Sequence, residues 1–170
     1  MSSPINLAEK FANSDKFRTL FQDGMSLVEE SASFLDGEGR EKAKNLPRAT
    51  AMLYGSESMR LTTRLMQLAS WLLLQRAANE GEMTRDQILE EKKKIKLGEN
   101  GHQTNNPSWN DLPDGFLDLV SRSLTLQNRV LTLDTELYGE IREQTEPNGN
   151  NPVGQQIDLL STAFGIRKRG

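Results

Sequence analysis

The apolar positions at the start of the chain recur at steps of three and four residues, which is the spacing of one face of an α-helix. Asn13 and Ser14 before them are suitable helix caps, and Asp15 favours the positive end of the helix. Gly37 then stops the pattern, so we predict a helix over about residues 14–36. Its apolar positions are Phe17, Leu20, Phe21, Met25, Val28, Ala32 and Leu35.

A second apolar pattern begins near Pro47 and ends before Gly81, and it predicts a helix over about residues 46–80. Near Trp71 this helix is apolar around almost its whole circumference, so it must be covered on more than one side. Two flanking helices cannot cover every side, which favours a homodimer interface in addition to a core. The residues concerned are Leu65, Met66, Leu68, Trp71 and Leu72. A purely internal core remains the alternative.

A third wide apolar stripe predicts a helix over about residues 114–144. Thr84 and Gln87 have the spacing of a capping box, which predicts a minor helix over about residues 85–97. The breaker-rich segment 98–108 that follows has no apolar periodicity and predicts a flexible loop between the second and third long helices.

These elements together predict an all-α fold, an elongated three-helix bundle formed by residues 14–145. Residues 1–13 are expected to be a flexible N-terminus. Residues 146–170 begin with a linker-like composition and are expected to be a disordered C-terminal tail. Within the tail, a short amphipathic segment is a candidate docking site for partner proteins. An equally favoured alternative is that this segment packs against the helical domain of its own chain. Its apolar residues are Ile157, Leu159, Leu160 and Phe164.

Composition narrows the possible functions. The 170 residues include no Cys and one His, so disulfides, thiolate metal sites and His-based metal sites are not expected. The net charge of −3 gives no general attraction to nucleic acid. The longest apolar stretch, 65–74, is far below the roughly 20 residues of a membrane span, and the N-terminus does not resemble a signal peptide. We therefore expect a cytoplasmic protein without metal, cofactor or small-molecule substrate.

The most interesting polar set is Glu57, Arg60 and Arg64, whose spacing places them on one side of the second helix. Asp134 on the third helix is the expected counter-charge. One interpretation is a small all-α enzyme or an anion-binding pocket. The favoured interpretation is a structural ion-pair network that fixes helix register or a subunit interface, because buried charges need partners whatever their function.

Other candidate groups give weaker indications. No phosphate-binding loop, zinc-protease motif or nucleophile elbow is present in the sequence. His102 could be a phosphoacceptor or a general base, but its position in the predicted loop favours a solvated side chain. The basic run 92–96 could dock nucleic acid or an acidic partner, but without interleaved aromatics a solvated helix face is favoured. The sequence therefore predicts no enzyme.

Several segments resemble the alphaproteobacterial family of regulator-of-CtrA-degradation proteins, and the similarity covers most of residues 17–144. The similarity is close to identity over the central helix and lower elsewhere. Gly55 occupies a position where a small helix-favouring residue such as Ala is expected. The matching segments are Leu35–Arg40, Leu46–Arg48, Glu57–Ala77, Asn79–Met83, Leu133–Asp134 and Asn151–Val153.

The resemblance implies a three-helix bundle that forms homodimers and acts as an adaptor in regulated proteolysis. Members of the family link a primed ClpXP protease to cargo such as the cell-cycle regulator CtrA. For this chain it implies a non-enzymatic adaptor for cell-cycle or signalling substrates, with protein partners and no nucleic acid or membrane among them.

Overall fold

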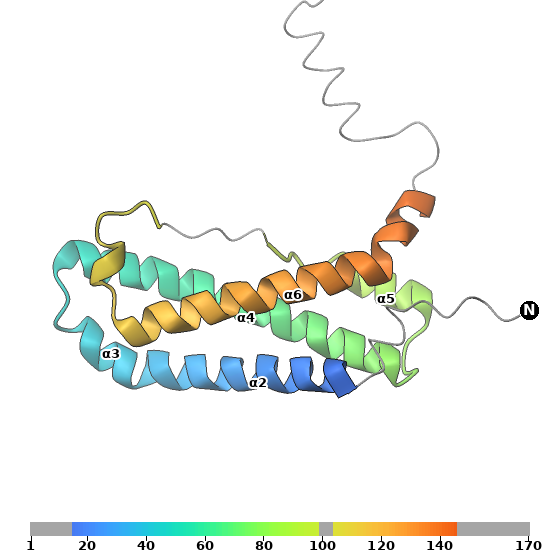
Figure 1. The fold of residues 1–170 in the computed structure, drawn as a ribbon, viewed down its shortest axis with the longest axis horizontal. Helices are drawn as coiled ribbons and strands as arrows, with labels where there is room; N and C mark the ends of the chain where they lie inside the picture. The colour runs from blue at the N-terminus through green and yellow to red at the C-terminus, as the bar shows by residue number, and fades with distance from the viewer. Residues whose placement is uncertain (1–14, 99–103, 146–170) are drawn as a thin grey trace, which may run out of the picture. The chain divides into compact units, whose positions relative to one another are not determined.

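The computed structural model describes residues 15–98 and 104–145, with side chains up to residue 139 (Figure 1). Every regular element within these ranges is helical, which confirms the predicted all-α fold. The elements are α2 (Asp15–Asp36), α3 (Glu38–Ala43), α4 (Arg48–Asn79), α5 (Arg85–Lys92), the 3₁₀ turn η1 (Trp109–Asp111) and α6 (Asp114–Thr145).

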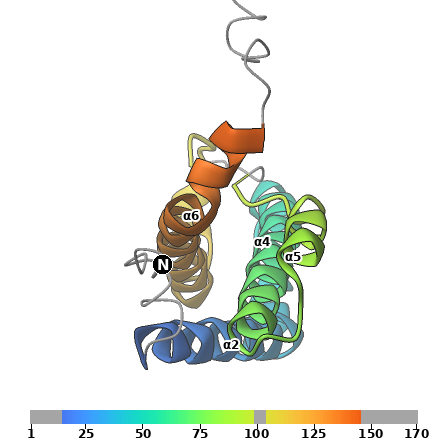
Figure 2. The same cartoon turned by 90° about the vertical axis from the view of Figure 1, so that its right-hand side faces the viewer.

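The chain divides into two compact units between Leu133 and Asp134, inside α6. In the first unit α2, α4 and the α6 segment up to Leu133 lie around a common axis, as the end-on view in Figure 2 shows. Their facing sides form one apolar core. Its most deeply buried members include Leu20 of α2, Leu61, Leu68, Trp71 and Leu72 of α4, and Phe116, Leu119 and Val130 of α6.

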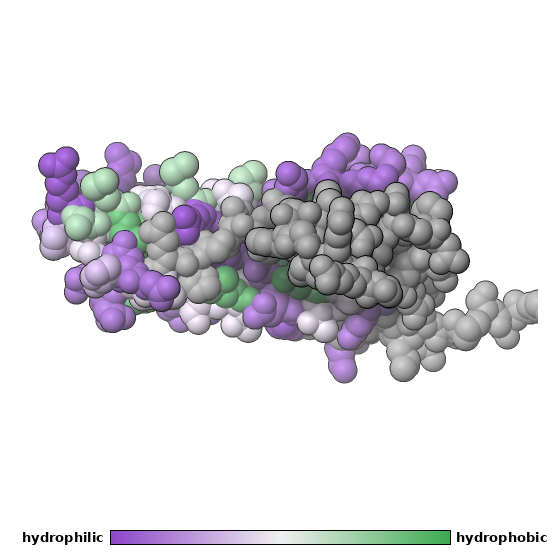
Figure 3. Space-filling model, turned by 90° about the horizontal axis from the view of Figure 1, so that it is seen from above, coloured by the Kyte–Doolittle hydropathy of each residue, from purple (hydrophilic) through white to green (hydrophobic). Residues whose placement is uncertain are grey.

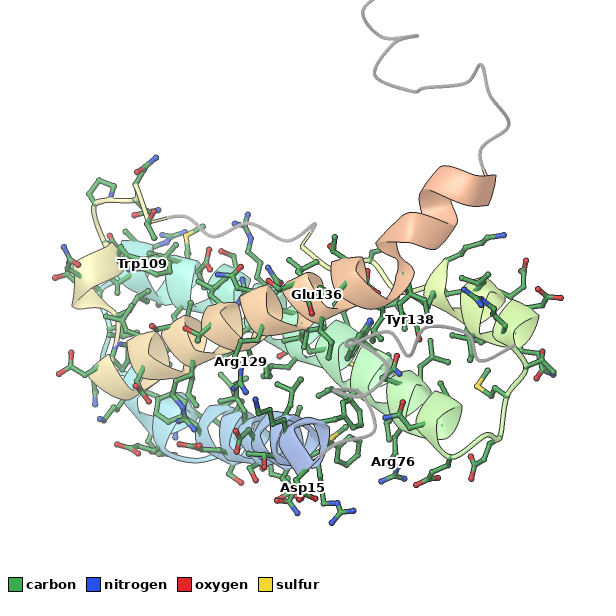
Figure 4. The ribbon with its side chains drawn as sticks, turned by 45° about the vertical axis from the view of Figure 1, so that its right-hand side comes forward. Asp15, Arg76, Trp109, Arg129, Glu136 and Tyr138 are labelled. Carbon is green, nitrogen blue, oxygen red and sulfur yellow. The ribbon has the colours of Figure 1, made fainter. Side chains whose placement is uncertain are left out.

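Ion pairs join α2 and α6 outside this core. Arg122 of α6 donates two hydrogen bonds to Glu30 of α2, at 2.8 and 2.7 Å. Arg129 projects from α6 and lies 3.9 Å from Asp23 of α2 (Figure 4). The charged side chains are about half exposed, so these pairs mainly select helix register and contribute little stability.

The capping box that opens α5 is present, since Thr84 and Gln87 exchange side-chain and backbone hydrogen bonds of 2.9 and 3.2 Å. Helix α5 ends at Lys92 and does not reach residue 97. Beyond it the chain is held to α4, because the Lys96 backbone N–H donates to Gln67 Oε1 at 3.1 Å. Gly81, at φ 72°, supplies the left-handed residue that ends α4.

Candidate interaction surface and buried polar network

The predicted polar set on α4 forms a buried network in the first unit. Glu57 and Arg64 are 1% and 2% exposed, and Arg60 Nη1 lies 3.4 Å from Glu57 Oε1. Arg64 Nη1 donates to the buried Ser123 Oγ of α6 at 2.9 Å, and that hydroxyl donates to the Val120 carbonyl at 2.7 Å. The network therefore links α4 to α6 through groups hidden from solvent.

Burial and neighbouring charges act on Arg64 in opposite directions. Burial lowers the pKa of its guanidinium, the carboxylate of Glu57 raises it, and the charge of Arg60 lowers it. A guanidinium so far from solvent offers no approach to a soluble anion, which favours the structural interpretation over an anion-binding or catalytic one. Asp134, the expected counter-charge, is buried at the first position of the second unit.

The residues predicted for self-association separate into two groups. Leu65, Leu68, Trp71 and Leu72 are each no more than 4% exposed and fill the core of the chain itself. Met66 lies on the opposite side of α4 and is 65% exposed. Only Met66 of the five is therefore placed to contact another molecule directly, while the other four position the helix that carries it.

Met66 is one member of a larger exposed apolar row on α4. Met52, Met59, Met66 and Leu73 follow one another at intervals of seven residues and are 68, 74, 65 and 47% exposed. Figure 3 shows hydrophobic residues reaching the surface among hydrophilic ones. The sequence analysis did not single out Met52 or Met59 of this row, although the spacing of seven residues was a signal for both.

The basic run 92–96 belongs to a surface of mixed charge around α5. Lys93 and Lys94 pair with Glu90 and Glu91 at 3.1 and 2.9 Å, and all four side chains are substantially exposed. The same glutamates line an open depression of about 410 Å³ together with Glu82, Met83, Asp86 and Gln87. The internal pairing of this surface favours the interpretation of a solvated helix face.

Several predicted features lie outside the described residues: the N-terminal segment 1–13, His102, and the tail segment with Ile157, Leu159, Leu160 and Phe164. Across the described ranges no cluster of three His, Cys, Asp or Glu side chains is arranged to hold a metal ion. The helices in those ranges also include none with the length and apolarity needed to cross a membrane.

Comparison with known proteins places the chain in a family. Residues 8–164 match the family model described as "Protein of unknown function (DUF1465)". No curated protein matches the chain. The crystal structure of RcdA from Caulobacter crescentus CB15 is 44% identical in sequence, with a TM-score of 0.61. The match covers 76% of this chain and 97% of that one. The chain therefore belongs to the DUF1465 family, the family of RcdA-like proteins.

Proposed function

We propose that this protein is a non-enzymatic adaptor in regulated proteolysis, acting on cell-cycle or signalling substrates. The observation that carries the proposal is the 44% identity to RcdA over 97% of the length of that protein. The buried polar network supports it, because Arg64 donates to Ser123 inside the bundle and is not accessible to a substrate. Binding to other proteins would then use the outer surfaces of the molecule.

The adaptor acts in the cytoplasm by tethering. It binds the ClpXP protease, or a factor already bound to that protease, and at the same time binds a cargo protein. Joining the two raises the effective concentration of cargo at the protease without changing any chemical step. The tail residues Ile157, Leu159, Leu160 and Phe164 are the proposed docking segment for one of these partners, and the folded unit binds the other. The protein works as a homodimer.

The test measures degradation of candidate cargo proteins by ClpXP at increasing concentrations of the full chain. A tether accelerates degradation most at low cargo concentration. Because excess adaptor occupies protease and cargo separately, the rate then falls again at high adaptor concentration. The matched variant L159S/L160S keeps chain length and charge and is expected to lose the acceleration. Unchanged degradation of every cargo across the whole concentration range would refute an adaptor role.

A further inference from the structure

The segment between α4 and residue 98 adds no fully buried side chain to the core. Residues 82–97 contain α5 and the turns on either side of it, and none of them is buried. The apolar side chains of the segment are all partly exposed: Met83, Ile88, Leu89, Ile95 and Leu97. Because α2, α4 and α6 each bury several side chains, we expect this segment to open more readily than the three helices.

Many of the polar contacts of residues 82–97 are made within the segment itself. The capping box that opens α5 lies wholly inside it. So do the ion pairs of Lys93 with Glu90 and of Lys94 with Glu91, at 3.1 and 2.9 Å. These contacts join residues three apart, so they stay intact if the whole segment moves. Residues 82–97 can therefore move as one unit, here called the α5 flap.

A hydrogen bond near the end of the α5 flap ties it to α4. The backbone N–H of Lys96 donates to Oε1 of Gln67 at 3.1 Å, and Figure 2 shows α5 beside α4. Just beyond the flap, Leu131 Cδ1 of α6 lies 3.6 Å from the position that a Cβ on Gly98 would occupy. The flap is therefore closed in this structure, with Gln67 as one of the groups that hold it.

Glycines lie at both ends of the α5 flap. Gly81 and Gly98 are the residues of the described ranges with positive φ, at 72° and 81°. Glycine adopts backbone conformations of either sign at little cost, which suits it to a hinge. At Gly81 no other group lies within 4 Å of the position of a Cβ, so rotation there meets no neighbouring side chain.

We propose that the α5 flap swings off α4 as one unit about Gly81 and Gly98 while the three long helices stay folded, and that Gln67 helps to hold it closed. Opening uncovers the side of α4 that carries Gln67. The protein then has a closed and an open form that offer different surfaces to a partner. This conformational change goes beyond the proposed function and depends only on the fold, so the two are tested separately.

The first test is hydrogen exchange of the full chain, measured by mass spectrometry. Amides of residues 85–97 are expected to exchange faster than those in the middle of α2 and α4. Q67L removes the acceptor and keeps most of the side-chain volume, so it should accelerate exchange of the flap about fivefold, as loss of an ordinary hydrogen bond does. The control Q127L makes the same change at a partly exposed position of α6 and should leave flap exchange unchanged.

The second test asks whether α5 unfolds separately from the three long helices. E90P breaks α5 from within, because proline removes a backbone donor and clashes with the preceding turn. If the flap opens by itself, the urea midpoint of the remaining protein should stay within about 0.3 M of that of the unmodified chain. The matched variant T125P introduces proline at an exposed position of α6 and should lower the midpoint by more than about 1 M.

Three results would overturn the inference. Flap amides that exchange as slowly as those in the middle of α2 would show that no separate opening occurs. An effect of Q67L on flap exchange no larger than that of Q127L, or equal acceleration in all helices, would remove the role of Gln67. A fall in urea midpoint for E90P as large as that for T125P would show that α5 unfolds together with the bundle.

Discussion

Replacing Arg64 by Met removes the charge at the centre of the buried network and keeps most of the side-chain volume. Arg64 Nη1 donates to Ser123 Oγ at 2.9 Å, and a hydrogen bond from a charged group contributes about 1.5–3 kcal/mol. The change also removes the positive charge that interacts with the buried carboxylate of Glu57. Removing one member of a buried ion pair costs about 3–5 kcal/mol, so we expect R64M to lose about 4 kcal/mol of unfolding free energy.

Urea unfolding followed by circular dichroism at one fixed protein concentration measures the loss. With a denaturant slope of about 2 kcal/mol/M, a loss of 4 kcal/mol moves the midpoint by about 2 M. The control R60M removes a guanidinium whose side chain is 34% exposed and leaves Glu57 the charge of the buried Arg64, so it is expected to cost less than R64M. The double variant E57L/R64M removes both buried charges and is expected to be more stable than R64M. If R64M unfolds at the same urea concentration as R60M, the reasoning about a buried network is wrong.

Two further predictions concern stability. Gly24→Ala is expected to cost about 1–3 kcal/mol, because its new Cβ would overlap Leu72 in the core, whereas Gly55→Ala meets nothing and should stabilise α4 by about 1 kcal/mol. Thermal melting of both variants decides this, and equal shifts would contradict it. The hydrogen bond from Arg122 lowers the pKa of Glu30, so their pair stabilises the fold at neutral pH and loses this effect as pH falls below the ordinary glutamate range. Arg122→Met should therefore lower the free energy of unfolding slightly at neutral pH and leave it unchanged in acid. Urea unfolding of both proteins at the two pH values measures this, and a difference in unfolding free energy that persists in acid would contradict the role of the pair.

The sequence was sufficient to locate the three long helices and the start of α5, because local signals determine them. The spacing of Phe17, Leu20 and later apolar residues predicted α2, and the Thr84–Gln87 pair predicted where α5 begins. The spacing of Glu57 and Arg60 likewise anticipated their contact, since residues three apart on a helix are neighbours.

The sequence could not show which side of α4 faces the core. Leucine and methionine lie all round this helix, so its apolar periodicity is weak and both sides resemble an interior. Only the packing of the folded chain decides between them: Trp71 is buried, whereas Met66 is 65% exposed. The sequence also could not predict that Ser123 is the partner of Arg64, because the two residues are 59 positions apart along the chain.

The hydrogen bond between Arg64 and Ser123 has a consequence for the order of folding. During synthesis α4 leaves the ribosome well before residue 123, so the guanidinium of Arg64 must keep its water until α6 arrives. An early pairing of α2 with α4 alone would leave that cation without its Ser123 partner, which disfavours a dry intermediate. The bundle is therefore expected to dehydrate in one late step that depends on α6. Refolding rates should respond to substitutions that weaken the α6 contact as well as to those within α2 and α4.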